Sequence, residues 1–184
     1  MKVCVTGGAG YIGSVVVLKL IESGFEVVIF DDLSTGFKEN VPSEAELIVG
    51  SLIDITAIED AFIGCDAVMH FAGKSLVGES VAKPDLYHQI NVGGSANLFA
   101  AMKNSGVNKL VFSSSAAVYG EPKETPIKET AETKPTNPYG QSKLEVEGLI
   151  AQEDFNSISL RYFNVAGSDR KSTRLNSSHV KRSR

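Results

Sequence analysis

The sequence of 184 residues predicts an α/β fold built on a doubly wound parallel sheet. Short apolar runs of strand length alternate along the chain with longer helix-compatible segments, as they do in parallel sheets. The first run is followed by four glycines within seven residues and then, without a gap, by a helix-compatible stretch. The second run ends in two acidic residues. This order is typical of a Rossmann-like sheet that binds a dinucleotide: a strand, a glycine-rich turn, a helix, and a second strand that ends in an acidic residue.

The expected elements follow from these runs in chain order. Strands are expected at residues 2–6, 26–31, 46–50, 66–73, 109–113 and 157–163. Helices are expected at residues 11–21, 55–63, 84–104 and 138–153. Pro84 and Pro138 open the last two, since proline is accepted in the first turn of a helix. The polar segment 121–137, rich in Pro, Thr and Glu, predicts a surface loop or lid.

The glycines fit two registers, Gly8-x-Gly10-x-x-Gly13 and Gly7-x-x-Gly10-x-x-Gly13. Glycine lets backbone N–H groups approach a pyrophosphate without a Cβ in the way, and Gly13 lets the helix pack close to the sheet. The N-terminus of that helix then directs unpaired N–H groups and the positive end of its dipole at the anion. An ordinary flexible loop is the alternative, but the strand before and the helix after favour dinucleotide binding. We expect cofactor contacts from Gly7, Gly10, Tyr11, Ile12 and Gly13.

Asp31 ends the second expected strand and lies 18 residues past Gly13. This is close to the ~20 residues at which an acidic side chain binds an adenosine ribose. A carboxylate there also repels a 2′-phosphate, so the sequence favours NAD over NADP. Asp32 suits a turn or helix cap better than Asp31 does, and it is also expected near the cofactor.

Composition narrows the class of protein. The chain is 42% hydrophobic and 22% charged, and it has no apolar run long enough for a transmembrane helix. Its start reads as a strand and not as a signal peptide. Cys4 and Cys65 are isolated, which suits a reducing compartment and suggests no metal site. We therefore expect a cytoplasmic protein that does not associate with membranes.

Charge is distributed unevenly. Residues 168–184 carry six Lys or Arg and one Asp, whereas the rest of the chain carries 12 basic and 21 acidic residues. The acidic body argues against nucleic acid as a partner. The basic segment 168–184 is expected to be a disordered tail, and residues 169–179 can be encoded by a common sequencing-library adapter. Our hypothesis is a reading frame that runs into adapter DNA, with a nucleic-acid-binding tail as the alternative.

Tyr139 and Lys143 are spaced i and i+4 on an expected helix, so they share one face. The ammonium group is expected to lower the pKa of the phenol toward the range of a usable base. A hydroxyl group from the end of the fifth strand would complete the set, and Ser115 is our choice. Such pairs also occur on ordinary solvated helix faces, but the glycine motif and the serine run favour acid–base chemistry. His70 lies in an apolar run and is expected to be a hydrogen-bonded core histidine.

Five stretches of the chain carry a family resemblance. They are Val5-Thr-Gly-Gly-Ala-Gly-Tyr-Ile-Gly-Ser14, His70-Phe-Ala-Gly73 with Val77-Gly-Glu-Ser80, Phe112-Ser-Ser-Ser-Ala-Ala-Val-Tyr-Gly120, Asn137-Pro-Tyr-Gly-Gln-Ser-Lys143 and Leu160-Arg-Tyr-Phe-Asn164. The chain resembles the extended short-chain dehydrogenases/reductases, and among them the UDP-glucose 4-epimerase family. Ala116 and Ala117 stand where related dehydratases carry acidic residues, which favours an epimerase.

The resemblance implies a mechanism and a set of contacts. Tyr139 would take the proton from the sugar 4-hydroxyl while hydride passes from C4 to bound NAD, and the 4-keto sugar would rotate and take the hydride back. Catalytic roles would fall to Ser115, Tyr139 and Lys143. Further cofactor contacts would come from Leu52, Phe71, Ala72, Gly73, Asn91, Ser113, Tyr139, Lys143 and Tyr162. The UDP-sugar would be bound by Ser115, Tyr139 and Asn164.

The resemblance also implies limits and alternatives. It covers residues 1 to about 167, whereas relatives continue well beyond this point with most of the sugar-binding lobe. We therefore expect an N-terminal fragment that is inactive alone, from a parent that forms a homodimer through helices 84–104 and 138–153. Two departures affect cofactor contacts: Ser51 replaces an acidic residue after the third strand, and Lys74 comes one residue early. The alternatives are another nucleotide-sugar epimerase, acting on UDP-glucuronate or a UDP-pentose, and a non-catalytic dinucleotide-sensing protein.

Overall fold

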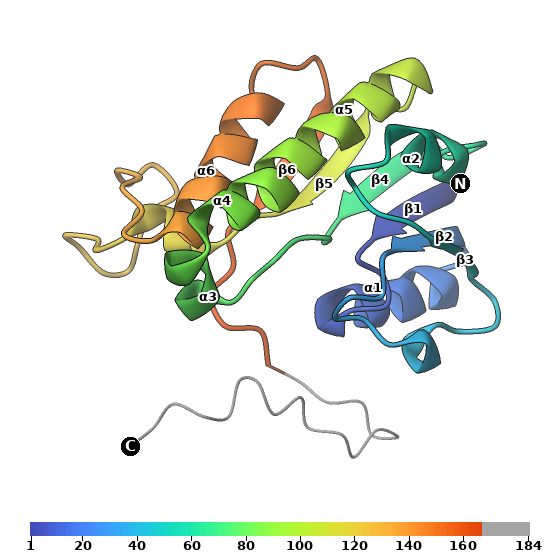
Figure 1. The fold of residues 1–184 in the computed structure, drawn as a ribbon, viewed down its shortest axis with the longest axis horizontal. Coiled ribbons are helices and arrows are strands. Elements are labelled where there is room, and N and C mark those ends of the chain that lie inside the picture. Colours follow the sequence, from blue (N-terminus) through green and yellow to red (C-terminus); the bar gives the residue numbers. More distant parts are fainter. Residues whose placement is uncertain (167–184) are drawn as a thin grey trace.

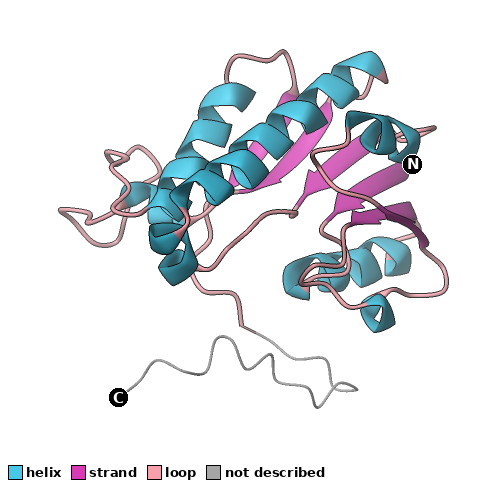
Figure 2. Cartoon of the chain, in the orientation of Figure 1, coloured by secondary structure: helices cyan, strands magenta, loops and turns pink. Residues whose placement is uncertain are grey.

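A computed structural model describes residues 1–166, which form a six-stranded parallel sheet with helices on both faces (Figures 1 and 2). The strands are β1 (Lys2–Thr6), β2 (Glu26–Asp31), β3 (Glu46–Val49), β4 (Ala67–His70), β5 (Lys109–Ser113) and β6 (Asn156–Leu160). Their order in the sheet is β3-β2-β1-β4-β5-β6, and every neighbouring pair is parallel. The strand order reverses between β1 and β4, so the predicted doubly wound α/β fold is confirmed.

The helices follow the predicted pattern with two differences, and two predicted strands are clearly shorter than expected. They are α1 (Tyr11–Glu22), α2 (Ile55–Ala61), α3 (Val77–Ala82), α4 (Pro84–Tyr87), the π-helix η2 (His88–Gly93), α5 (Gly94–Asn104) and α6 (Pro138–Ile150), with short 3₁₀ turns η1 (Lys38–Asn40) and η3 (Ala116–Tyr119). The expected helix 84–104 is present, but its centre is a π-helix. Helix α3 was not predicted. The strand expected at 66–73 ends at His70 because the chain leaves the sheet there, with Gly73 at a φ of +149°. The strand expected at 157–163 begins at Asn156 and ends at Leu160, where its pairing with β5 ends.

The sheet lies between two apolar cores, one on each face. The larger core joins strand residues to α2, α5 and α6 through side chains such as Phe62, Leu98 and Phe112. The smaller core joins β1 and β2 to α1, with Val17 at its centre. Full burial of one such side chain stabilises the fold by about 1.5–3 kcal/mol. The two cores fix α1 and α6 on opposite faces, so that both helices begin at the carboxyl edge of the sheet.

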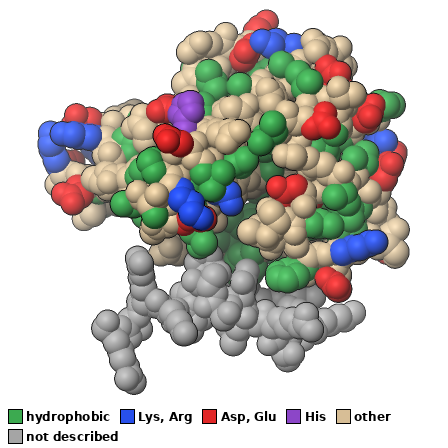
Figure 3. Space-filling model, in the orientation of Figure 1, with side chains coloured by type: hydrophobic (Ala, Val, Ile, Leu, Met, Phe, Trp, Pro, Cys, Tyr) green, Lys and Arg blue, Asp and Glu red, His purple; other side chains and the backbone are tan. Residues whose placement is uncertain are grey.

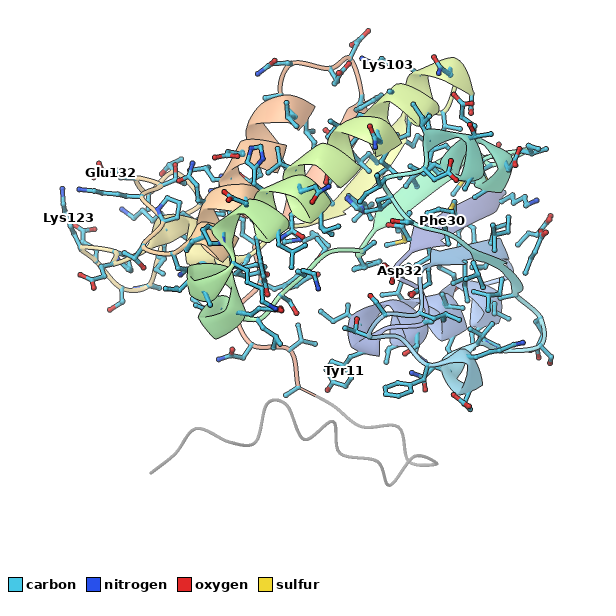
Figure 4. All side chains as sticks on the ribbon, viewed as in Figure 1. Tyr11, Phe30, Asp32, Lys103, Lys123 and Glu132 are labelled. Carbon is cyan, nitrogen blue, oxygen red and sulfur yellow. The ribbon has the colours of Figure 1, made fainter. Side chains whose placement is uncertain are left out.

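The loop between η3 and α6 stands away from the sheet, as Figure 4 shows for Lys123 and Glu132. These two side chains form an exposed ion pair at 3.5 Å. The surface loop predicted at 121–137 is thereby confirmed. On the face drawn in Figure 3, acidic and basic side chains are interspersed among apolar and neutral ones.

Within residues 1–166, no helix combines the length and apolar character needed to cross a bilayer. Cys4 is buried and Cys65 is half-buried, and both are free thiols. The basic segment 168–184, with its expected disorder and adapter origin, lies outside the described residues.

Candidate cofactor and acid–base site

The glycine loop packs so tightly that its main chain forms the wall of the site. A Cβ on Gly13 would lie 2.1 Å from the Gly7 carbonyl oxygen, and one on Gly7 would lie 2.6 Å from the Ala72 nitrogen. Gly7 also has a φ of +72°, a conformation that favours glycine. Gly10 is the N-cap residue of α1 and offers no side chain to bind the first N–H groups. The N-terminus of α1, with the positive end of the helix dipole, therefore faces the site without a side chain from its N-cap residue.

Asp31 is 7% exposed, and its carboxylate holds the glycine loop. Its Oδ2 accepts a hydrogen bond from the Ala9 N–H at 3.0 Å, and its Oδ1 accepts one from the Leu33 N–H at 2.8 Å. The sequence predicted a ribose contact for Asp31 but missed this second role. Asp32 caps a turn, since its Oδ1 accepts from Ser34 N–H at 2.9 Å and from the Ser34 hydroxyl at 2.6 Å. Figure 4 places Asp32 on the loop after β2 and Tyr11 at the start of α1.

The chain leaving β4 forms the opposite wall. Ala72 contacts Gly7, and its N–H lies 3.4 Å from Thr6 Oγ1. A Cβ on Gly73 would meet Asn91 Oδ1 at 3.1 Å and Lys143 Nζ at 3.8 Å. The structure therefore brings three predicted site residues, Gly73, Asn91 and Lys143, to one place. Phe71 is half-buried between β4 and Ala72. Leu52 packs in the larger core, where its Cβ lies 2.9 Å from the position of a Cβ on Gly94.

Helix α6 presents the predicted acid–base pair. Asn137 caps it by accepting from the Gly140 N–H at 2.8 Å, and Pro138 occupies its first turn. Lys143 Nζ lies 5.9 Å from the centroid of the Tyr139 ring and donates to the Ser113 carbonyl at 2.8 Å. Lys143 is 5% exposed, and burial lowers its pKa to about 8.

The pKa of Tyr139 moves the opposite way from the prediction. Burial raises the pKa of this phenol, and a hydrogen bond with the Ser115 side chain lowers it by a smaller amount. The expected lowering by Lys143 is therefore wrong for the protein alone. The ammonium group lies over the tyrosine ring and donates to a strand carbonyl, so it does not offset the loss of water around the phenol.

The three serines after β5 have separate partners. Ser113 shares a short hydrogen bond with the Tyr162 hydroxyl, and Ser114 donates to Glu147 Oε1 at 2.5 Å. Ser115 accepts from the Ala117 N–H at 3.1 Å and bonds with Tyr139. Ser115 is thus the serine beside the phenol, as the sequence predicted.

Glu147 is a residue that the sequence reasoning missed. It accepts two hydrogen bonds from Arg161 Nε, at 2.9 and 3.1 Å, in addition to the one from Ser114. Arg161 also donates to the Tyr119 hydroxyl at 3.0 Å. Glu147 follows Lys143 by one helical turn, as Lys143 follows Tyr139, and this i, i+4, i+8 spacing is the signal that could have revealed it.

The remaining predicted residues differ in how close they lie to the acid–base pair. His70 is a core histidine, as predicted: its ring nitrogens bond with Thr6 Oγ1 at 2.7 Å and Ser95 Oγ at 2.9 Å, and burial lowers its pKa to about 3. Tyr162 is half-buried beside Ser113. Asn164 follows β6 and is exposed.

Comparisons with known proteins agree with this geometry. The sequence model described as the NAD dependent epimerase/dehydratase family matches residues 3–183. The chain belongs to this family. Among curated relatives, it is 51% identical to a UDP-glucose 4-epimerase of Streptomyces lividans over 92% of this chain and 54% of that protein. It is 50% identical to one of Corynebacterium glutamicum over 91% of this chain and 52% of that protein.

Solved structures give the same result. The UDP-glucose 4-epimerase of Brucella ovis in complex with NAD has a TM-score of 0.89 and 37% identity, over 91% of this chain and 53% of that one. The enzyme of Thermotoga maritima with UDP-glucose has a TM-score of 0.86 and 38% identity, over 91% of this chain and 57% of that one. The chain therefore spans about half the length of the relatives that it matches.

Proposed function

We propose that this chain supplies the NAD-binding part and the acid–base residues of a 4-epimerase that interconverts UDP-glucose and UDP-galactose. The observation that carries the proposal is that Lys143 lies over the Tyr139 ring and close to Gly73, in the same loop whose Ala72 contacts Gly7 of the glycine loop. Ser115 lies beside the Tyr139 hydroxyl. The chain is 51% and 50% identical to two proteins named UDP-glucose 4-epimerase, which supports UDP-sugars as the substrate class of the proposed enzyme.

The residues present fit NAD. The close approach of Gly13 to Gly7 leaves main-chain N–H groups as the surface for a pyrophosphate. Asp31 would accept a hydrogen bond from the adenosine ribose and disfavour a 2′-phosphate. Bound NAD would supply a hydride acceptor and donor, and its positive nicotinamide would favour the phenolate form of the nearby tyrosine. The full set proposed to hold it is Gly7, Gly10, Tyr11, Ile12, Gly13, Asp31, Asp32, Leu52, Phe71, Ala72, Gly73, Asn91, Ser113, Tyr139, Lys143 and Tyr162.

Tyr139 Oη is the group proposed to move the proton of the sugar 4-hydroxyl. Burial raises the pKa of Tyr139 and the hydrogen bond with Ser115 lowers it by a smaller amount, so the phenolate needs the further stabilisation that the positive nicotinamide of bound NAD would give. Asn164 would bind the UDP-sugar from the segment after β6.

Three further features belong to the proposal. A homodimer would form through the helical segment 84–104 and α6, which already lie side by side (Figure 1) and are joined by the exposed His88–Glu145 pair at 3.4 Å. Free thiols at Cys4 and Cys65 support a reducing, cytoplasmic location. A dinucleotide sensor would have no need of the assembled Ser115, Tyr139 and Lys143, which favours the enzyme.

The test is a chimera of residues 1–166 with the C-terminal part of the Streptomyces lividans relative. We expect the chimera to convert UDP-galactose to UDP-glucose in a coupled assay, whereas the chain alone, lacking remote contacts to the uridine diphosphate, shows no turnover. Tyr139→Phe keeps the ring and removes the acid–base group, so the chimera should lose about 10²-fold or more in rate while still binding NAD. Near-normal turnover by that variant would exclude Tyr139 as the base.

A further inference from the structure

The loop that follows β4 is held by side chains of the helix that packs beside it. Asn91 binds both main-chain atoms of Lys74: its Oδ1 accepts from the Lys74 N–H at 2.8 Å, and its Nδ2 donates to the Lys74 carbonyl at 3.0 Å. Asn91 is 3% exposed. Lys74 lies in a segment that has left the sheet, and the Asn91 amide provides the two main-chain hydrogen bonds that a neighbouring strand would otherwise provide.

Tyr87 makes the second attachment, two residues further along the loop. It is 0% exposed, and its hydroxyl accepts from the Leu76 N–H at 2.9 Å and donates to the Leu76 carbonyl at 2.8 Å. Glu79 Oε2, a second acceptor, lies farther away at 3.2 Å. Burial raises the pKa of Tyr87 to about 12, so the hydroxyl keeps its proton and remains a donor.

The spacing of the two attachments matches the geometry of both segments. Side chains four residues apart on a helix are about 6 Å apart, and residues two apart in an extended chain are separated by about 6.6 Å. Leu76 is extended, with a φ of −84° and a ψ of 103°. Asn91 lies in the π-helix η2, whose wider turn changes the direction of its side chain relative to that of Tyr87. The spacing of Asn91 and Tyr87 on the helix therefore matches that of Lys74 and Leu76 along the loop.

The same network reaches the helix that carries the acid–base pair. Asn91 Nδ2 also donates to Ser142 Oγ at 3.0 Å, and the Ser142 hydroxyl donates to the Tyr139 carbonyl at 2.8 Å. Ser142 is 3% exposed, so these bonds are shielded from water. The loop, the π-helix and the first turn of α6 are thus joined through buried polar groups.

We propose that Tyr87 is a positioning residue that, together with Asn91, holds loop 73–76 against the nicotinamide end of the cofactor site. The inference rests on the proposed NAD site and adds a residue that the glycine loop does not involve. Gly73, at the start of the loop, is the point of contact, since a Cβ there would reach Asn91 and Lys143. Without the Tyr87 hydroxyl, the Leu76 N–H and carbonyl would bond to water, and the loop would be attached to the helix through Lys74 alone, which leaves Gly73 less firmly positioned.

The test uses Tyr87→Phe in the full chain, with Tyr119→Phe as a matched control. Tyr119 is also buried, at 5% exposed, and its hydroxyl bonds to Arg161 away from loop 73–76. Amide hydrogen exchange is measured at Leu76, and affinities are measured for NAD and for ADP, which lacks the nicotinamide half. In Tyr87→Phe we expect Leu76 exchange to speed up about tenfold and the Kd for NAD to rise about fivefold. The Kd for ADP should stay within about twofold, and the control should change none of the three.

Each other outcome has a definite meaning. If the wild-type chain binds NAD and Tyr87→Phe binds it equally well, the inference is overturned and the proposed function stands. Equal losses for NAD and ADP would show general destabilisation and also overturn the inference. Absence of NAD binding by the wild type overturns both. If Tyr87→Phe does not fold, Leu76→Pro removes the N–H donor from the loop side, at a φ that proline accepts, and the NAD and ADP affinities decide in the same way.

Discussion

The two halves of the sheet contribute differently to the site: one contributes main-chain atoms and the other contributes side chains. In the half formed by β1, β2 and α1, the main chain is the functional surface, and glycines keep side chains out of it. In the half formed by β4, β5 and α6, the site is built from side chains held by hydrogen bonds to the end of β5 and the segment after it: Tyr139 to Ser115, Lys143 to the Ser113 carbonyl and Glu147 to Ser114. The first half should therefore be sensitive to one added carbon atom, and the second to the loss of one polar group.

The largest effect is expected from an added methyl group in the first half. Gly13→Ala would place a Cβ 2.1 Å from the Gly7 carbonyl oxygen, so the glycine loop must move. We expect a loss of stability of about 3 kcal/mol and loss of NAD binding. Thermal melts and NAD titration measure both.

Gly148→Ala is the matched control for Gly13→Ala. A Cβ on Gly148 meets nothing within 4 Å on α6. Alanine is favoured over glycine inside a helix, so this variant should gain about 0.5–1 kcal/mol and bind NAD unchanged. If Gly13→Ala behaves like Gly148→Ala, the main chain is not the functional surface of the first half.

A smaller effect is expected from removing one charge in the second half. Arg161→Gln removes the charged partner of Glu147 and leaves it the hydrogen bond from Ser114. We expect the free energy of unfolding to fall by about 1–2 kcal/mol. Lys103→Gln breaks an exposed pair with Glu153, 2.8 Å long, and should cost less than about 0.5 kcal/mol. Denaturant unfolding of both variants gives the comparison. Equal costs would mean that the Glu147 network is no more than a surface ion pair.

The two halves also differ in how far their sequence reveals them. The glycine spacing and Asp31 predicted the first half, because main-chain geometry there depends on residues close together in the sequence. Strand β5 and the pairing of Tyr139 with Lys143 were likewise readable, since a helix fixes the i, i+4 spacing. The sequence did not predict three features: the π-helix at Asn91, the hydrogen bonds of the Tyr87 hydroxyl to Leu76, and the raised pKa of Tyr139. Each depends on packing between segments distant in the chain, and the burial that raises the pKa of the phenol exists only in the folded protein.

The most direct test of the whole account is calorimetric titration of the chain and of its Tyr139→Phe variant with NAD and NADP. The account predicts saturable binding of one NAD per chain, weaker binding of NADP because of Asp31, and Kd values for NAD that agree within about twofold between the two proteins. Such a result would separate the affinity for NAD from the acid–base role of the Tyr139 hydroxyl. No saturable binding of NAD by the wild type, or binding of NADP as tight as that of NAD, would contradict the account.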